Sequence, residues 1–315
     1  MGAYSRSMTV RLGMQIGNFS YGTPIEQLFP IVMAQAREAE SAGFDSLFLM
    51  DHFYQLPQAG SPDQPMLEAY TALGALATAT ERIQLGTLVT GNSYRNPTLL
   101  AKAVTTLDVI SQGRAILGIG TGWFEYEHHS LGFEFGTFAD RFGKLEEALQ
   151  IILPMIRGER VTFSGSWYRT ENAFAEPRFR AHIPSLIGGS GEKKTIPLAA
   201  RHFDHLNILA GFDELPHKVR VARQCCADIG RDPESLETSV LVAALIGDGV
   251  SPDMLPDDVR QQAVAGTPEQ VAEQVKTKVL DAGVDGVILS PVTQLGYSPG
   301  PIAEVGRLLK PVTGG

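Results

Sequence analysis

The chain has 315 residues, of which 43% are hydrophobic and 19% charged, a composition typical of a soluble globular enzyme with a large core. No apolar run approaches the roughly 18 residues that cross a bilayer, which excludes a membrane-spanning helix, and a formal net charge of -9 argues against non-specific binding to nucleic acid. Residues 1–10 lack the apolar centre of a signal peptide, so we expect a disordered start and a cytoplasmic protein.

Apolar strand-like runs alternate along the chain with segments of helical periodicity, which is the pattern of a parallel α/β fold. We expect about eight such strands, the number that closes a TIM-like (β/α)8 barrel, and favour this barrel over an open doubly wound sheet. The motif Ala42-Gly43-Phe44-Asp45 returns near the end of the chain as Ala282-Gly283-Val284-Asp285, as a repeated unit would. The strands are expected to begin near Arg11, Ser46, Ile83, Ala115, Pro184, His205, Glu237 and Asp285.

Two segments break this alternation within what we predict to be a single domain of residues 1–315. Residues 158–183, with β-like pieces at 160–163 and 167–169, are expected to form an insertion between the fourth and fifth strands. Residues 248–266 are rich in Asp and Pro and predict a long loop before the last helix. Long loops in barrels often act as lids.

An aspartate and a histidine follow the second predicted strand, at Asp51 and His52. A carboxylate and an imidazole are costly to bury at a strand end unless they are paired, and histidine exchanges protons near neutral pH. This pair therefore indicates a catalytic site. The structural alternative is a helix-capping Asp51 beside a packed His52.

The third and fourth predicted strands also end in residues unsuited to a buried strand. Residues 83–89 run into Thr90-Gly91-Asn92, and residues 115–120 run into Thr121-Gly122-Trp123. Such residues at the carboxyl ends of parallel strands face the ligand. The glycines from Gly118 to Gly122 do not make a dinucleotide-binding fingerprint, because that motif needs a glycine at Trp123. We expect them to let a flat ligand approach closely.

Charged residues near these two strand ends have two possible roles. Arg95 either holds a carboxylate or phosphate, or only shields its loop. Glu125, Glu127 and His128 either line a pocket or begin a solvated helix. We predict no metal site, because the adjacent His128 and His129 point in different directions from the backbone and the two cysteines are also adjacent.

A glycine-rich turn follows the fifth predicted strand. Gly188-Gly189-Ser190-Gly191 is expected to open a helix that contains Lys193 and Lys194. Free backbone N–H groups, a hydroxyl and a positive helix end together form an anion cradle, so we predict a phosphate site in preference to a plain tight turn.

These motifs together resemble the luciferase-like flavin and deazaflavin oxidoreductases from Arg11 to about Leu209. Versions with Asp-His-Phe-Tyr and Gly-Trp-Phe-Glu are typical of the branch that depends on coenzyme F420, a 5-deazaflavin, whereas FMN serves other branches. The motifs that carry the resemblance are Phe48-Leu49-Met50-Asp51-His52-Phe53, Leu85-Gly86-Thr87-Leu88-Val89-Thr90 with Arg95-Asn96-Pro97, Leu107-Asp108-Val109-Ile110-Ser111-Gln112-Gly113-Arg114, Gly118-Ile119-Gly120-Thr121-Gly122-Trp123 and Ile187-Gly188-Gly189-Ser190-Gly191.

The resemblance implies a TIM-like barrel with an insertion after the fourth strand. It implies a cis peptide at the Leu88-Val89 bulge, behind the cofactor ring. It also implies a homodimer, which is the usual assembly in that family. In the F420-dependent sugar-phosphate dehydrogenases of the superfamily an acid directly follows the Thr-Gly pair. Trp123 stands at that position here, which puts a sugar-phosphate substrate in doubt. The cofactor residues implied are Asp51, Thr87, Leu88, Val89, Thr90, Thr121, Gly122, Trp123, Gly188, Gly189, Ser190, Gly191 and Lys194.

The sequence thus predicts an F420-dependent oxidoreductase that transfers a hydride between the deazaflavin and a small organic substrate. We expect His52 to donate the proton and Asp51 to orient the His52 ring. Glu125 is a second candidate for the proton donor. One alternative is an FMN-dependent monooxygenase that activates oxygen. Another, of a different class, is a protein that binds F420 without turnover, against which the Asp51-His52 pair counts.

Overall fold

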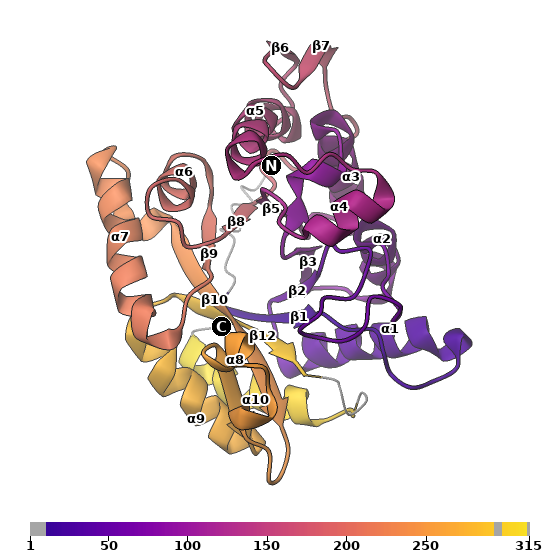
Figure 1. Ribbon diagram of the computed structural model, residues 1–315, viewed down its shortest axis with the longest axis vertical. Coiled ribbons are helices and arrows are strands. Elements are labelled where there is room, and N and C mark those ends of the chain that lie inside the picture. Colours follow the sequence, from indigo (N-terminus) through magenta and orange to yellow (C-terminus); the bar gives the residue numbers. More distant parts are fainter. Residues whose placement is uncertain (1–10, 293–297, 314–315) are drawn as a thin grey trace.

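The computed structural model describes residues 11–292 and 298–313, so the expected disordered start at 1–10 lies outside the described residues. Within the described chain, eight parallel strands close into a ring, because β10 bonds to both β9 and β12 (Figure 1). The predicted barrel and the eight predicted strand starts, each to within one residue, are confirmed. In ring order the strands are β1 (Leu12–Ile16), β2 (Ser46–Leu49), β3 (Gln84–Thr87), β5 (Ala115–Gly120), β8 (Ser185–Gly188), β9 (His205–Ile208), β10 (Glu237–Ile246) and β12 (Gly286–Pro291).

Helices surround this ring and bury the outward-facing side chains of the strands (Figure 1). A smaller apolar cluster, which contains Phe48, Leu88, Ile116, Leu186 and Ile288, fills the inside of the barrel. In β2, β5, β8 and β12 the two clusters take alternate residues, as the period of two in a strand requires. The surrounding helices are α1 (Ile25–Ala42), α2 (Ala69–Ala79), α3 (Pro97–Ile110), α5 (Phe138–Ile156), α6 (Thr195–His202), α7 (Leu215–Asp228), α9 (Pro268–Lys278) and α10 (Pro301–Thr313).

The repeated sequence motif corresponds to a repeated structural unit. Gly43 and Gly283 both adopt the left-handed conformation that ends a helical segment, with φ of 93° and 91°. Two residues later, the carboxylates of Asp45 and Asp285 each accept a hydrogen bond from a backbone N–H of the neighbouring strand, at 2.9 and 2.7 Å. Each aspartate thereby satisfies an amide at the amino-terminal edge of the sheet.

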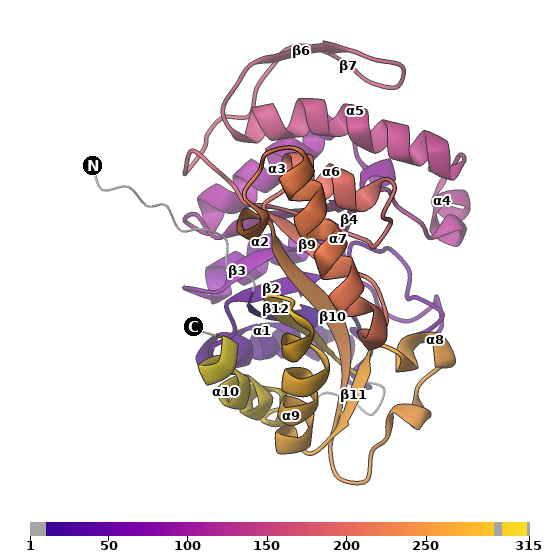
Figure 2. The same cartoon turned by 90° about the vertical axis from the view of Figure 1, so that its left-hand side faces the viewer.

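The insertion at 158–183 forms a two-stranded antiparallel hairpin of β6 (Val161–Ser164) and β7 (Arg169–Ala173), which extends over α5 (Figure 2). The second strand begins later than the sequence predicted. The backbone N–H groups of Trp167 and Tyr168 instead donate to the carboxylate of Glu147 on α5, at 3.0 and 3.1 Å. This side chain therefore ties the turn of the hairpin to the helix.

The prediction of a loop throughout 248–266 is wrong for its second half. The segment contains a 3-10 turn (Pro252–Met254), the short helix α8 (Asp257–Arg260) and β11 (Ala263–Gly266), which pairs in parallel with β10 outside the ring. The apolar residues of β11 are buried, so burial against β10 outweighs the loop-like composition that precedes it. No helix in 11–292 or 298–313 has the length and apolar character to cross a bilayer.

Candidate active site

The predicted site residues lie at one end of the barrel, because they follow the carboxyl ends of neighbouring parallel strands. Asp51 and His52 follow β2, Leu88 and Val89 follow β3, residues 121–123 follow β5, and residues 189–194 follow β8. Two short helices, α4 (Glu125–Leu131) and α8, lie on this side of the molecule, at the right of Figure 2. We refer to this end as the barrel mouth.

A bulge interrupts the chain between β3 and the two-residue strand β4 (Thr90–Gly91), which pairs with β5. The Leu88-Val89 peptide is cis, as the family resemblance implied. The side-chain amide of Gln15 on β1 donates to the carbonyl of Leu88 at 2.9 Å, and the hydroxyls of Thr87 and Thr90 share a hydrogen bond of 2.7 Å. These contacts hold the bulge at the barrel mouth.

The glycines of β5 make room for this bulge. A Cβ on Gly118 would lie 1.9 Å from the carbonyl oxygen of Thr87, and a Cβ on Gly120 would lie 3.0 Å from a methyl of Val89. The expectation that these two glycines admit a ligand is therefore wrong, because their open sides face the protein's own bulge, at a backbone carbonyl for Gly118 and at the Val89 side chain for Gly120.

Asp51 does not orient His52, contrary to the sequence prediction. The buried carboxylate of Asp51 accepts two hydrogen bonds from Arg95, at 2.5 and 2.9 Å. Arg95 also donates to Glu68 at 2.6 Å, and its guanidinium lies 4.9 Å from the ring centre of Tyr70. Burial would lower the pKa of Arg95, but the charge of Asp51 raises it above its usual range. Arg95 thus binds a carboxylate of its own chain.

The partner of His52 is Glu127, from the first turn of α4. The Nδ1–H of His52 donates to the Glu127 carboxylate at 2.9 Å. The same carboxylate accepts hydrogen bonds from the hydroxyl of Tyr94 at 2.6 Å, from the backbone N–H of Tyr54 at 2.8 Å and from the backbone N–H of Phe53. Burial would raise the pKa of Glu127, yet these donors lower it below its usual value, so the group is a buried carboxylate.

Glu125, the second candidate, lies apart from this network. Its side chain is 62% exposed and faces His129 at 3.8 Å. The spacing of buried residues explains the difference, since Phe124, Glu127 and His128 stand at i, i+3 and i+4 and share the inner face of the helix. This spacing is the signal in the sequence that could have identified Glu127, and not Glu125, as the buried acidic residue of the helix.

Aromatic rings surround His52. Its ring lies edge-on to Trp123 and Phe124, with ring centres 5.8 Å apart in both cases, and its side chain is 13% exposed. Trp123 is 53% exposed at the barrel mouth. Since Nδ1 is occupied by Glu127, Nε2 is the nitrogen of His52 that is left to exchange a proton with a ligand.

Residues next to these aromatic rings hold the loop after β5. Gly122 has a φ of 78°, and its carbonyl accepts a hydrogen bond from Arg141 of α5 at 3.1 Å. The buried His128 bonds to the carbonyl of Phe124 at 2.8 Å and to the hydroxyl of Ser93 at 2.7 Å, so it has a structural role. Over the described residues, no group of three or more His, Cys, Asp or Glu side chains is arranged to hold a metal ion.

The glycine-rich turn after β8 has the features of an anion site. Gly189 has a φ of 142°, and its N–H donates to the carbonyl of Asn207 at 2.9 Å. The helix α6 begins at Thr195 with no side-chain cap and no acidic residue in its first turn, as far as the described residues show. The N–H groups of Ile196 and Leu198 already donate to the carbonyls of Gly191 and Lys194, at 3.0 Å each, and Pro197 has none, so α6 offers an anion the positive end of its dipole.

Charges around this turn favour an anion as well. The carboxylate of Glu192 is bound by Lys218 at 2.6 Å and by His217 at 3.1 Å, both on α7. Lys194 lies over the ring of Phe142, 4.7 Å from its centre, so its ammonium contacts α5. The residues present therefore fit a phosphate group held by the backbone of Ser190 and Gly191 beside the positive end of α6, because the N–H of Gly189 is used by Asn207.

Comparison with known proteins gives these features a context. The sequence model of the luciferase-like monooxygenase family matches residues 14–251. The chain is 37% identical to an F420-dependent glucose-6-phosphate dehydrogenase of Microbacterium testaceum over 214 residues, which is 68% of this chain and 56% of that protein. A protein of the same name from Nakamurella multipartita is 36% identical over 61% of this chain and 56% of its own length. The chain thus spans a little over half the length of these curated relatives.

Solved structures share the fold. An F420-dependent secondary alcohol dehydrogenase in complex with an F420-acetone adduct has a TM-score of 0.78 at 20% identity, over 97% of this chain and 98% of its own. A long-chain alkane monooxygenase has a TM-score of 0.78 at 16% identity, over 97% and 92% of the two chains. At such identities the likeness concerns the barrel alone. With the family model covering 14–251, including the bulge, His52 and the glycine-rich turn, the chain belongs to the luciferase-like monooxygenase family.

Proposed function

We propose that this protein is an F420-dependent oxidoreductase that exchanges a hydride with a small organic substrate at the barrel mouth. The observation that carries the proposal is the pairing of His52 with the buried carboxylate of Glu127 beside the Leu88-Val89 bulge. The relatives named F420-dependent glucose-6-phosphate dehydrogenase, at 36% and 37% identity, support the choice of cofactor. When bound, the deazaflavin would carry the hydride, and the protein would position the reactants and transfer the proton.

The residues that would hold the cofactor fall into two groups. The bulge at 87–90, together with Asp51 and residues 121–123, would contact the ring. The turn at 188–191 would surround the phosphate, with the backbone N–H groups of Ser190 and Gly191 as donors and Lys194 adding a nearby positive charge. A flat ring needs a fixed wall, and the hydrogen bond from Gln15 to the carbonyl of Leu88 fixes one.

His52 would move the proton that accompanies the hydride. Glu127 keeps the Nδ1 proton in place and stabilises the positive charge of a protonated imidazole. Nε2 then gives a proton to the substrate oxygen during reduction and takes one during oxidation. Asp51, in turn, keeps Arg95 and the loop after β3 in position.

Two other functions remain as alternatives to be tested. An FMN-dependent monooxygenase would suit the name of the family. A protein that binds F420 without turnover would suit the same barrel, but would have no use for a histidine held by a buried carboxylate. We further propose that the protein is cytoplasmic and forms a homodimer. The two free cysteines, Cys225 and Cys226, fit the reducing environment of the cytoplasm.

Separate titrations of the purified protein with F420 and with FMN, followed by fluorescence quenching, test the proposal. F420 is expected to bind much more tightly. If FMN is retained through purification while F420 is ignored, the monooxygenase function replaces it. If F420 binds tightly and no hydride donor, such as an alcohol, or acceptor, such as a ketone, is turned over, the protein is a non-catalytic F420-binding protein. Size-exclusion chromatography tests the dimer.

A further inference from the structure

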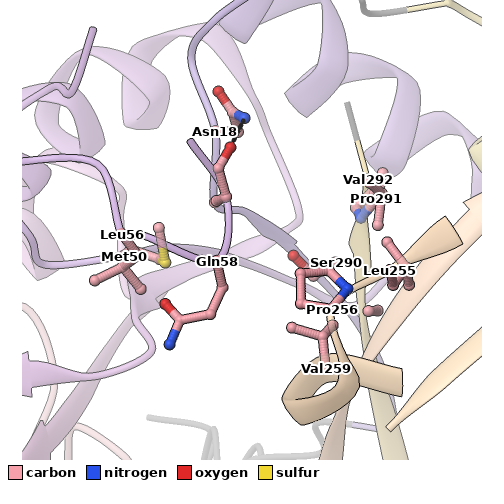
Figure 3. A pocket seen from close by; sticks show the side chains of 13 residues that line it. Asn18, Met50, Leu56, Gln58, Leu255, Pro256, Val259, Ser290, Pro291 and Val292 are labelled. Carbon is pink, nitrogen blue, oxygen red and sulfur yellow. Dashed lines mark hydrogen bonds between the residues drawn. The ribbon is translucent and has the colours of Figure 1, made fainter. Parts of the chain in front are cut away.

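A cavity of about 140 Å³ opens at the barrel mouth beside the loop that carries His52 (Figure 3). The ends of β1 and β2 and the loop at 56–59 form one side, where Met50 and Leu56 lie. The end of β12 and residues 255–259 form the other, where Pro256 and Val259 lie. The cavity is thus enclosed between the barrel and the α8 segment.

This cavity adjoins the bulge that we assign to the cofactor ring. A Cβ on Gly17, one of the lining residues, would lie 3.5 Å from the side-chain oxygen of Gln15 and 3.5 Å from the sulfur of Met50. The amide of the same Gln15 holds the carbonyl of Leu88. A group in the cavity is therefore one side chain away from the bulge, and it lies beside the segment that begins with Asp51 and His52.

The lining carries no charged side chain among the described residues, and most of it is apolar. The nearby Arg260 is engaged, since its guanidinium pairs with Asp253 and Asp257 and donates to the carbonyl of Leu255. A phosphate or carboxylate would lose its hydration here without gaining a cation, which is strongly unfavourable.

One buried polar atom remains without a partner in the wall. The side-chain oxygen of Gln58 is buried and accepts no hydrogen bond from the described residues. The other amide in the wall, Asn18, is used within the loop, because its oxygen accepts from the N–H of Ser20 at 2.7 Å. Neither amide therefore offers a charge or a strong anion-binding group to the cavity, and the wall suits an uncharged, apolar group.

We propose that this cavity selects the substrate by holding the apolar substituent, of up to about six carbons, of an uncharged alcohol or ketone. The size follows from the volume, since an apolar cavity of about 150 Å³ admits benzene. This inference rests on the proposed function for the reacting group, and it departs from the sugar phosphate in the names of the relatives.

The test uses cyclohexanol as the probe and measures its binding to the whole protein by saturation-transfer NMR, with and without F420. Val259→Trp fills the cavity and is expected to weaken cyclohexanol binding about tenfold or more. F420 quenching is expected to stay unchanged in this variant. Val312→Trp makes the same substitution at an exposed position of α10 and is the control. Gln58→Leu keeps the shape of the wall, and cyclohexanol binding in this variant is expected to stay within about twofold of wild type.

Turnover separates the failure of this inference from the failure of the proposed function. With F420 bound, oxidation of cyclohexanol with a kcat/KM above that for glucose 6-phosphate supports the cavity as the substrate site. Preferred turnover of glucose 6-phosphate overturns the inference while the proposed function stands. Cyclohexanol binding that Val259→Trp does not alter overturns the inference in the same way. A protein that binds cyclohexanol at the cavity but not F420 retains the site and loses the proposed function.

Discussion

His52 and Glu127 lie 75 residues apart in the chain, and the Nδ1–H of the histidine donates to the carboxylate of the glutamate at 2.9 Å. The carboxylate is fully buried, whereas the imidazole keeps a small exposed fraction at the barrel mouth. An arrangement of this kind fixes the tautomer and the orientation of the histidine ring. It also joins the loop after β2 to the helix after β5.

Replacing Glu127 by glutamine tests whether its charge matters. Gln keeps the size of the side chain but has a single acceptor oxygen, so some donors at this site lose their partner. We expect Glu127→Gln to lower the free energy of unfolding by about 1–3 kcal/mol and turnover by about 10- to 100-fold. Urea unfolding and steady-state rates measure both. The exposed Glu125→Gln is the matched control, and equal effects in the two variants would contradict the assignment.

Removing the imidazole tests the chemistry directly. His52→Ala is expected to lower turnover by about 100-fold or more, the usual contribution of a general acid. The melting temperature of the apo protein should change little, because Glu127 keeps its bonds to Tyr94 and to the backbone. His129→Ala, at an exposed position of the same helix α4 that carries Glu127, serves as the control. A wild-type rate in His52→Ala, or a defect fully explained by lost stability, would show a packing role.

The lowered pKa of Glu127 makes part of the stability depend on pH. The folded protein holds the carboxylate in its charged form, while an unfolded glutamate titrates near about pH 4.3. The contribution is therefore fully present above that pH and is lost as the pH falls through the folded pKa. The difference in unfolding free energy between wild type and Glu127→Gln should be constant from about pH 7 to 5 and should shrink below about pH 4. A difference that does not vary with pH would refute this.

The phosphate cradle is tested by two substitutions of different kinds. A Cβ on Gly189 would lie 3.0 Å from a methyl of Thr195, at a φ of 142°, so Gly189→Val should distort the turn and weaken F420 binding strongly. Lys194→Ala should remove only a screened charge contact of about 1 kcal/mol or less. Gly230→Val, at a positive φ with open space around it, controls for backbone strain. A greater loss in Lys194→Ala than in Gly189→Val would reverse the roles.

The barrel was predictable because its signals are local. Each strand is a short apolar run, and each unit is closed by a residue such as Gly43 or Gly283, whose φ of 93° or 91° suits glycine. Such features depend on neighbours in the sequence, so strand starts were found to within one residue. The prediction of a loop throughout 248–266 failed because it used local composition alone. The strand β11 in this segment forms through contact with β10, which local composition does not reveal.

The side-chain pairs at the site were not predictable in this way. Asp51 and His52 are adjacent in an extended segment, where consecutive side chains point to opposite sides, and this geometry separates them. Each finds its partner elsewhere, Asp51 in Arg95 and His52 in Glu127. Those partners become neighbours only when the strands are placed side by side in the ring.

The position of β11 has a consequence for how substrate range can change in this protein. The segment that carries Pro256 and Val259 is joined to the barrel at both ends, by β10 before it and by β11 after it, yet it lies outside the closed ring. The family match ends at residue 251, before this segment, whereas it includes His52, Glu127 and the glycine-rich turn. If the cavity holds the substrate as we propose, one of its walls lies outside the stretch that carries the cofactor residues, so substitutions at 255–259 can change substrate range while the cofactor site stays intact.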